Sequence, residues 1–285
     1  MDIIRDPKAF QDLSWNWRCA GLNTVLVPSM GFFHAGHLRL MDAARQRAGS
    51  MGKVMVSLFV NPTQFGPGED LAAYPRDFDR DRDLAASRGV DVLFAPEPEA
   101  MYAPDAATWV EVPSLSTGLC GVSRPIHFRG VATVVSKLFM LAMPRAAVFG
   151  QKDWQQLAVI RRMVRDLNIP VEIVGHPIVR EADGLAMSSR NVYLTPEERR
   201  LAPAIHAGLE QARNSAQAGE TSSESILGAF AAHLSEHLPT ARIDYAQIIH
   251  PDNLVPLERV EGPTLMAVAV FLGKARLIDN MLLRT

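Results

Sequence analysis

Apolar runs of strand length alternate with segments of helical period through the first two thirds of the chain, and no other feature restricts its fold as strongly. The runs are rich in β-branched residues, as expected of strands buried on both faces. Strands that alternate with helices in this way predict a parallel α/β sheet. The predicted strands are 24–28, 54–60, 90–95, 146–149 and 171–174, and the predicted helices are 38–48, 76–88, 131–143 and 154–167.

The pattern changes after Arg190. Thr195 and Pro196 form a helix start, and the segment that follows is rich in Ala, Glu and Gln as far as residue 238. Two strand-like runs, 243–249 and 265–271, then flank a turn region with several prolines. Segment 214–225 is expected to be a loop between helices. We therefore predict an α/β domain over residues 1–180 and a smaller α+β domain over residues 181–285.

Composition restricts the partners. The formal net charge of the 285 residues is −2 and 48% of them are apolar, so nothing in the charge favours a nucleic-acid or membrane partner. Cys19 and Cys120 are too few for a metal site or a disulfide framework. The first residues lack the apolar segment of a signal peptide, and no run of about 18 apolar residues occurs. We expect a cytoplasmic protein.

The most informative motif follows the first predicted strand and reads M-G-F-F-H-A-G-H. Gly31 and Gly36 let the backbone approach a ligand, and His34 and His37 share one face at the start of the next helix. Free amides and imidazoles at a helix start suit a phosphate. The alternatives are metal ligands or ordinary polar residues, but no Cys or Glu is arranged as a further ligand, which favours phosphate.

Two later strand ends also carry polar side chains. Gln64 follows the strand at 54–60, where a neutral amide can bind a hydroxyl or a carboxylate. Gly150, Lys152 and Asp153 follow the strand at 146–149, and the lysine offers a point charge for a phosphate. Asp153 either accepts from a ribose hydroxyl or caps the next helix. Gln156, one turn on, is expected to face the same cleft.

A polar loop, V-R-E-A-D-G-L-A-M-S-S-R-N, lies near the predicted domain junction. Ser188 and Ser189 can donate hydrogen bonds and Arg190 can bind phosphate oxygens in a bidentate manner. Such a loop can close over a polyphosphate.

The helix predicted at 131–143 places Val131, Val134, Val135 and Leu138 on one side, which core packing explains. Three polar residues on or beside this helix are secondary candidates for binding a carboxylate or phosphate: His127, Arg129 and Lys137.

Taken in order, these motifs resemble the pantothenate synthetase family, part of the H-x-G-H nucleotidyltransferases, over almost the whole chain. The stretches F-V-N-P-T-Q-F, F-R-G-V-A-T-V-V-S-K-L, G-Q-K-D-W-Q-Q-L and G-K-A-R-L-I-D-N add to the resemblance. Departures from the usual family pattern are Ser29, Phe32, Phe33 and Gln151. Phe32 and Phe33 are expected to affect how the M-G-F-F-H-A-G-H loop opens or which apolar surface this loop presents to its neighbours.

The resemblance implies a Rossmann-like first domain, a smaller C-terminal lid domain and a homodimer. It implies that His37 is the catalytic histidine, with His34, Lys152 and Arg190 as further catalytic residues, and that Gln64 and Gln156 bind pantoate and β-alanine. The residues it places around ATP are Met30, Gly31, His34, His37, Gly150, Lys152, Asp153, Val179, Met187, Ser188, Ser189 and Arg190.

The implied reaction joins pantoate to β-alanine with ATP as a substrate, through a pantoyl adenylate, and releases AMP and pyrophosphate. Mg²⁺ is expected to bridge phosphate oxygens with few protein ligands, so no protein metal site is predicted. One rival is a nucleotidyltransferase that adenylates a phosphorylated acceptor, which should demand more cations around Gln64 and Gln156. Another is a catalytically silent nucleotide-binding protein, whose expected mark is loss of the motif residues.

Overall fold

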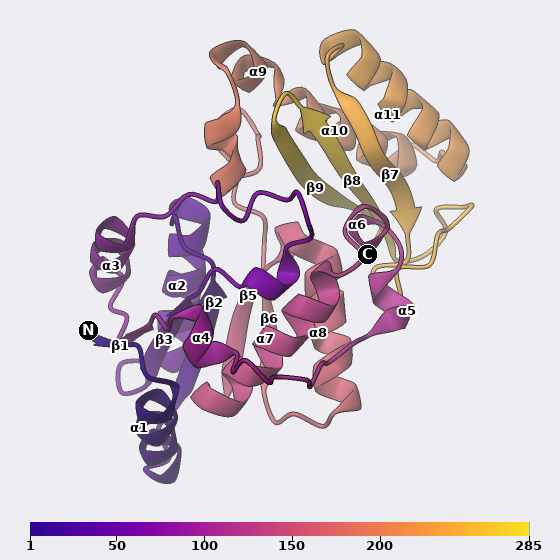
Figure 1. Ribbon diagram of the computed structural model, residues 1–285. Coiled ribbons are helices and arrows are strands. Elements are labelled where there is room, and N and C mark those ends of the chain that lie inside the picture. Colours follow the sequence, from indigo (N-terminus) through magenta and orange to yellow (C-terminus); the bar gives the residue numbers. More distant parts are fainter. Residues whose placement is uncertain (285) are drawn as a thin grey trace.

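The computed structural model describes residues 1–284. Within them, six strands form a parallel sheet in the order β1-β4-β3-β2-β5-β6 (Figure 1). The strands are β1 (Asp2–Ile4), β2 (Thr24–Ser29), β3 (Lys53–Leu58), β4 (Val92–Phe94), β5 (Ala146–Gly150) and β6 (Glu172–His176). Every pairing in this sheet is parallel, which confirms the fold class predicted from the alternating pattern.

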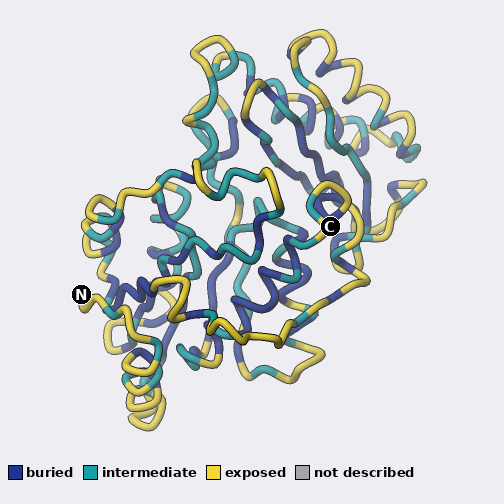
Figure 2. Tube along the Cα trace, viewed as in Figure 1, coloured by how far each residue is buried: buried dark blue, intermediate teal, exposed yellow. Residues whose placement is uncertain are grey.

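Helices cover both faces of the sheet. Neighbouring residues of a strand point to opposite faces, so Leu26 packs against one layer while Val25 and Val27 pack against the other. The first layer contains α1 (Pro7–Cys19), α7 (His127–Ala142) and α8 (Trp154–Asp166), and the second contains α2 (Ala35–Ala48) and α3 (Phe78–Ser87). Figure 2 shows the central strands β2 to β5 and most of α7 as buried segments inside an exposed periphery.

The strand order reverses between β2 and β5. From β2 the chain runs outward through β3 to β4 and then crosses back to β5 on the other side of β2. In open α/β sheets, ligands bind at such a reversal, outside the carboxyl ends of the strands. The topology therefore marks the ends of β2 and β5 as the place to look for a site.

A three-stranded antiparallel sheet, β7-β8-β9, forms the C-terminal part within the described residues. Its strands are β7 (Arg242–Ile249), β8 (Thr264–Leu272) and β9 (Ala275–Arg284), and its helices are α9 (Pro196–Leu201), α10 (Ala204–Gln217) and α11 (Ser223–His237). Val268 and Val270 of β8 face the core formed with α10 and α11. Leu265 and Ala267 face the opposite way, toward Leu119 and Trp154 of the first part.

Specific hydrogen bonds join the two parts. Asn280 of β9 donates from Nδ2 to the carbonyl oxygens of Gln151 and Lys152, at 2.9 and 3.0 Å. Arg180 pairs with Asp279 over 2.6 Å. The late motif G-K-A-R-L-I-D-N thus holds the β9 strand against the segment that carries Lys152.

The observed elements differ from the predicted ones in several places. β1 and α1 were not predicted, because three residues are too few for a periodic signal and α1 is mostly exposed. β9 was not predicted as a strand either, since charged and amide residues interrupt its apolar alternation. Of the loop expected at 214–225, both ends are helical, because α10 continues to Gln217 and α11 begins at Ser223. Within the described residues, no helix is long and apolar enough to cross a membrane.

Candidate active site

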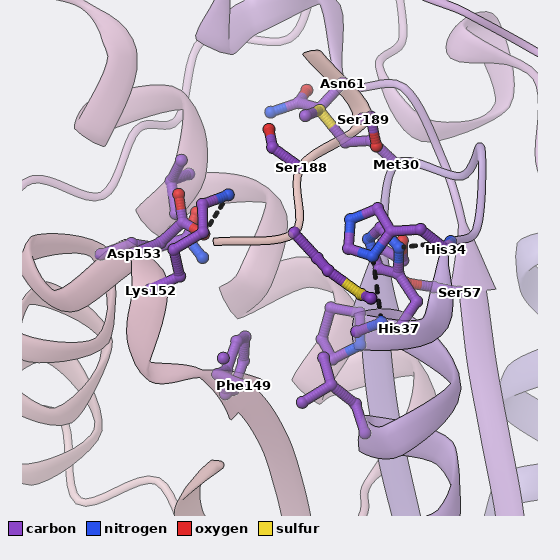
Figure 3. Close-up of a pocket in the computed structure, with 18 of the residues that line it drawn as sticks. Met30, His34, His37, Ser57, Asn61, Phe149, Lys152, Asp153, Ser188 and Ser189 are labelled. Carbon is purple, nitrogen blue, oxygen red and sulfur yellow. Dashed lines mark hydrogen bonds and ion pairs between the residues drawn. The ribbon is translucent and has the colours of Figure 1, made fainter. Parts of the chain in front are cut away.

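A cavity of about 220 Å³ opens at the carboxyl ends of β2, β3 and β5, where the strand order reverses (Figure 3). It brings together residues far apart in the sequence. The predicted site residues that line it are Met30, His34, His37, Gln64, Gly150, Lys152, Asp153, Gln156, Val179, Met187, Ser188, Ser189 and Arg190. Gly31 does not line it; this glycine lies buried in the turn after β2, at φ 89°, where a Cβ would meet Leu58 and Asp81.

His34 and His37 cap the helix that they begin. His34 is the N-cap residue of α2, and its Nδ1 accepts from the amide of Gly36 at 3.1 Å. Nδ1 of His37 accepts from the amide of His34 at 3.3 Å. A Cβ at position 36 would lie 2.8 Å from His34 Nδ1, so the ring can fold over this turn only because residue 36 is glycine. The Nε2 atoms remain for a ligand.

The two histidines are neutral at pH 7. Burial lowers the pKa of His34 to about 4, with a further contribution from Lys152, and burial, His34 and Lys152 lower the pKa of His37 well below its ordinary value. Since Nδ1 of each ring accepts a hydrogen bond, the proton of the neutral ring lies on Nε2. The pair can therefore offer two Nε2–H donors to an anion without carrying charge.

Asp81 holds the loop that presents the histidines. Its carboxylate is 1% exposed and accepts from the amides of Phe32 and Phe33 at 2.6 and 2.7 Å. Burial raises the pKa of this carboxyl, opposed by those two hydrogen bonds. Phe33 is fully buried in the core, while Phe32 has a φ of 51° and lies beneath the guanidinium of Arg80. The two phenylalanines thus help to fix this loop.

The Gln64 amide is oriented by its neighbours. Asn61 donates to Gln64 Oε1 at 3.1 Å and to the carbonyl of Gly130 at 3.1 Å, while Asn61 Oδ1 accepts from Tyr102 at 2.9 Å. Gln64 Nε2 points to Met30 Sδ at 3.1 Å. Because Oε1 is held by Asn61, Nε2 is directed along the cavity wall.

Gly130 of α7 sets the position of this glutamine loop. A Cβ at residue 130 would lie 2.5 Å from the carbonyl oxygen of Thr63 and 2.6 Å from the amide of Gln64. We expect Gly130→Ala to displace the loop, lower turnover and reduce the free energy of unfolding by about 1–3 kcal/mol. The matched control is Gly228→Ala in α11, where a Cβ meets nothing within 4 Å and about 0.5–1 kcal/mol of added stability is expected. Equal changes in the free energy of unfolding of Gly130→Ala and Gly228→Ala, measured by chemical denaturation, would show that Gly130 does not set the position of this loop.

Lys152 and Asp153 reach the cavity from the turn before α8. Lys152 Nζ lies 3.8 Å from Asp153 Oδ2. Asp153 occupies the N-cap position of α8, yet its side chain makes no capping hydrogen bond. Of the two roles left open for Asp153, helix capping is therefore wrong. Gln156 lines the same cavity, as its spacing predicts, whereas the adjacent Gln155 is buried and holds the loop 115–120.

The loop with Ser188, Ser189 and Arg190 also lines the cavity. Ser188 Oγ accepts from the amide of Arg190 at 3.2 Å, and Ser189 donates to the carbonyl of Phe32 at 3.4 Å. Arg190 donates from Nε and Nη2 to the two oxygens of Asp70, both at 3.0 Å. The guanidinium nitrogens of Arg190 that could bind a phosphate are thus paired with Asp70 in this structure.

The three secondary candidates, His127, Arg129 and Lys137, lie in different surroundings. His127 is 8% exposed and lies beside Gln64. Arg129 pairs with Glu111 and lies over the ring of Trp109, while the Lys137 ammonium lies over the ring of Tyr102. Neither Arg129 nor Lys137 is among the residues that line the cavity described above.

Burial of His127 makes stability depend on pH. Desolvation, with Arg124 nearby, lowers its pKa to about 4, below the value near 6.5 of the unfolded chain. The unfolded chain therefore takes up the proton first, and the free energy of unfolding falls as the pH drops from about 6.5 to about 4. The loss attributable to this residue is on the order of 3 kcal/mol. Urea unfolding of His127→Gln should show a flatter pH profile over this range; parallel profiles would refute the assignment.

Several lining residues escaped the sequence predictions. Ser57 is 1% exposed, and its hydroxyl has no hydrogen-bond partner among the described residues. A serine inside an apolar strand was the available signal. The apolar side of α7 was assigned to the core, and it is buried there, but the same side chains also form a wall of the cavity. The apolar lining residues outside the predicted set are Pro28, Leu40, Phe59, Val131, Val134, Val135, Leu138, Phe149, Pro177 and Ile178.

A protein metal centre has no visible ligand set. Within residues 1–284, no group of three or more His, Cys, Asp and Glu residues is placed to hold a metal ion. The Nδ1 atoms of His34 and His37 accept from the amides of Gly36 and His34 and are thus used in capping. This arrangement favours hydrogen-bond donation over metal binding for the histidine pair.

Comparisons with known proteins agree over the full length. The family model described as pantoate-beta-alanine ligase matches residues 2–282. The chain is 61% identical over 284 residues to the pantothenate synthetase of Nitratidesulfovibrio vulgaris (strain DSM 19637 / Miyazaki F), covering 99% of both chains. It is 52% identical over 283 residues to that of Moorella thermoacetica, again covering 99% of each.

Solved structures show the same fold. A crystal structure of pantothenate synthetase from Thermus thermophilus superposes with a TM-score of 0.92 at 45% identity, with all of both chains covered. The pantoate-beta-alanine ligase of Francisella tularensis, complexed with beta-gamma ATP and beta-alanine, superposes with a TM-score of 0.82 at 32% identity, covering 100% of this chain and 98% of that one. With the family model matching nearly its whole length and its fold in common with these enzymes, the chain belongs to the pantoate-beta-alanine ligase family.

Proposed function

We propose that this protein condenses pantoate with β-alanine at the expense of ATP, through a pantoyl adenylate, and releases AMP and pyrophosphate. The observation that carries the proposal is one cavity lined by His34, His37, Lys152 and Arg190 on its polar side and by Gln64 and Gln156 beside an apolar wall. The polar side suits a triphosphate. The glutamines and the apolar wall suit a small hydroxy acid such as pantoate, which carries a geminal dimethyl group.

In the first step, the pantoate carboxylate attacks the α-phosphorus of ATP and pyrophosphate leaves. Negative charge grows on the phosphate oxygens, and the Nε2–H groups of His34 and His37, the Lys152 ammonium and Arg190 stabilise it. The amides of Gln64 and Gln156 align the acid for attack. The proposed ATP-binding set further comprises Met30, Gly150, Asp153, Val179, Met187, Ser188 and Ser189, all of which line the cavity.

In the second step, the uncharged amine of β-alanine attacks the acyl carbon and AMP leaves. Neither step requires a covalent bond to the protein, so the protein acts by positioning and by charge stabilisation. Exclusion of water by the serine loop would protect the adenylate from hydrolysis.

Mg²⁺ would arrive with the phosphates of ATP. Mg²⁺ commonly takes one or two protein carboxylates in addition to phosphate oxygens and water. Among the described residues that line the first cavity, Asp153 supplies such a carboxylate, and its side chain is 46% exposed. This donor set fits a metal that enters as part of the substrate.

The organisation proposed with this reaction is a pantoate- and ATP-binding domain of residues 1–180 and a lid domain of residues 181–285. Two observations support the division: the parallel and antiparallel sheets have separate cores, and the segment that links them, residues 179–190, lines the cavity with both of its ends. The proposed assembly is a cytoplasmic homodimer.

The reaction is tested by omitting one substrate at a time. With Mg-ATP, pantoate and β-alanine, purified protein should form AMP, pyrophosphate and pantothenate in equal amounts. Omission of pantoate should abolish AMP formation. A dinucleotide product with a phosphorylated acceptor would instead establish the rival transferase, and ATP binding without turnover of any acid and amine would establish a silent nucleotide-binding protein.

A further inference from the structure

A second cavity, of about 370 Å³, adjoins the first between α7, α8 and the β7-β8-β9 sheet. Lys152, Asp153, Gln156, Ser188 and Arg190 line both cavities. A molecule in the second cavity therefore meets the groups that surround a ligand in the first. The roles proposed for these five shared residues leave the other residues that line the second cavity without a function.

Arg124 is the cation of the second cavity that is tied to the pantoate residues. Its Nη2 donates to the carbonyl oxygen of Gln64 at 3.2 Å, and its side chain is 15% exposed. His127 accepts from Arg124 Nη1 through Nε2 at 3.4 Å and donates from Nδ1 to the same Gln64 carbonyl at 3.0 Å. Because Arg Nη1 can only donate, this tautomer satisfies both contacts of the imidazole. His127 thus fixes Arg124 and Gln64 relative to each other.

The guanidinium of Arg124 is already used to bind a carboxylate. Its Nε and Nη2 donate to Glu69 Oε2, at 2.9 Å from Nε. Glu69 and the adjacent Asp70 belong to one turn, and each binds an arginine of the cavities, Arg124 and Arg190 respectively. The position of Arg124 and its fork geometry therefore suit the carboxylate of a small ligand that takes the place of Glu69.

From this arrangement we propose that the second cavity receives the amine substrate and that Arg124 binds its carboxylate, in exchange for Glu69. The proposal rests on the proposed function, since it concerns the acceptor of that reaction. β-Alanine has one charged group at each end of a short chain. A carboxylate held beside the Gln64 backbone leaves the amine to reach the acyl carbon of an acid held by the Gln64 and Gln156 side chains.

The other cations of the cavity suit this role less well. Arg276 donates from Nε and Nη2 to Asp244 at 3.0 and 2.7 Å, and both residues belong to the C-terminal sheet. Lys274 is exposed in the turn between β8 and β9. Lys274 therefore serves as the control, because it lines the same cavity with the same charge from the opposite wall.

The test separates the two half-reactions. Pantoate-dependent exchange of labelled pyrophosphate into ATP, measured without amine, reports adenylate formation; the complete assay reports the KM for β-alanine. Arg124→Met should raise that KM on the order of ten- to hundredfold and leave exchange within about twofold of the parent protein. Lys274→Met should change neither. Circular dichroism and the exchange rate itself show whether each variant is folded.

A substrate analogue tests the same contact without relying on one variant. The parent protein should use β-alanine in preference to 3-aminopropanamide, which lacks the carboxylate, and Arg124→Met should lose most of that preference. An unchanged KM and an unchanged preference in Arg124→Met would overturn the proposal, as would a larger effect of Lys274→Met. Absence of exchange in the parent protein would instead refute the proposed function.

Discussion

Replacing His37 by asparagine is expected to lower kcat on the order of a hundredfold while the fold is retained. Asparagine Oδ1 can take the place of Nδ1, which accepts from the His34 amide at 3.3 Å, so the helix cap is preserved. The Nε2–H donor that faces the cavity is lost. Steady-state kinetics with all three substrates, together with thermal unfolding, measures both effects.

The complementary replacement is His37→Gln, whose side-chain nitrogen can reach the position of Nε2 but whose oxygen cannot cap the helix. We expect it to retain more turnover than His37→Asn and to be the less stable of the two. His237→Ala provides a control histidine, half-exposed on α11 of the C-terminal part. If His37→Asn turned over at the rate of the parent protein, His37 would have no part in the mechanism.

Replacing Lys152 by methionine is expected to lower kcat by about 10²–10³-fold. Methionine keeps the length and most of the packing of the side chain, which is 21% exposed, and removes its charge from the phosphate side of the cavity. The same substitution at Lys137, whose ammonium lies over Tyr102, is the matched control. Rapid quench of pyrophosphate formation should place the defect of Lys152→Met in the first step. An equal loss of kcat in Lys137→Met would show that the effect does not depend on the position of the Lys152 charge in the cavity.

The parts of the fold that follow from local periodicity could be predicted from the sequence. β2, β3 and β5 are apolar runs that end in polar motifs, and strand ends of a parallel sheet meet at one edge. That rule alone suffices to bring His34, Gln64 and Lys152 to one place. β9 could not be predicted in this way, because Arg276, Asp279 and Asn280 interrupt its pattern to form contacts with the other strands and the first domain.

The electrostatic character of the histidine pair required the structure. The H-x-G-H spacing predicts two imidazoles at a helix start, but the degree of burial and the capping by Nδ1 decide that both are neutral donors. Catalysis in this account therefore combines two uncharged donors with the charges of Lys152 and Arg190.

Residues whose role depends on partners distant in the sequence could not be predicted from the sequence either. Asp70 and Glu69 read as an ordinary acidic turn, and only the folded chain shows that they bind Arg190 and Arg124. Asp81 reads as one of several acids in α3, yet it is the one that holds the amides before His34. Such pairings join residues 48 to 120 positions apart, as in the Asp81–Phe33 and Asp70–Arg190 contacts, so local spacing carries no signal of them.

The adenylate is the central claim, and the fate of the carboxylate oxygens of pantoate tests it most directly. Pantoate labelled with ¹⁸O in its carboxylate should be converted with ATP and β-alanine in unlabelled water, and the AMP analysed by mass spectrometry. Attack of the carboxylate on the α-phosphorus transfers one oxygen to the nucleotide, so we expect AMP with one ¹⁸O and pantothenate with the other in its amide carbonyl. Unlabelled AMP, or label in inorganic phosphate or pyrophosphate, would contradict it.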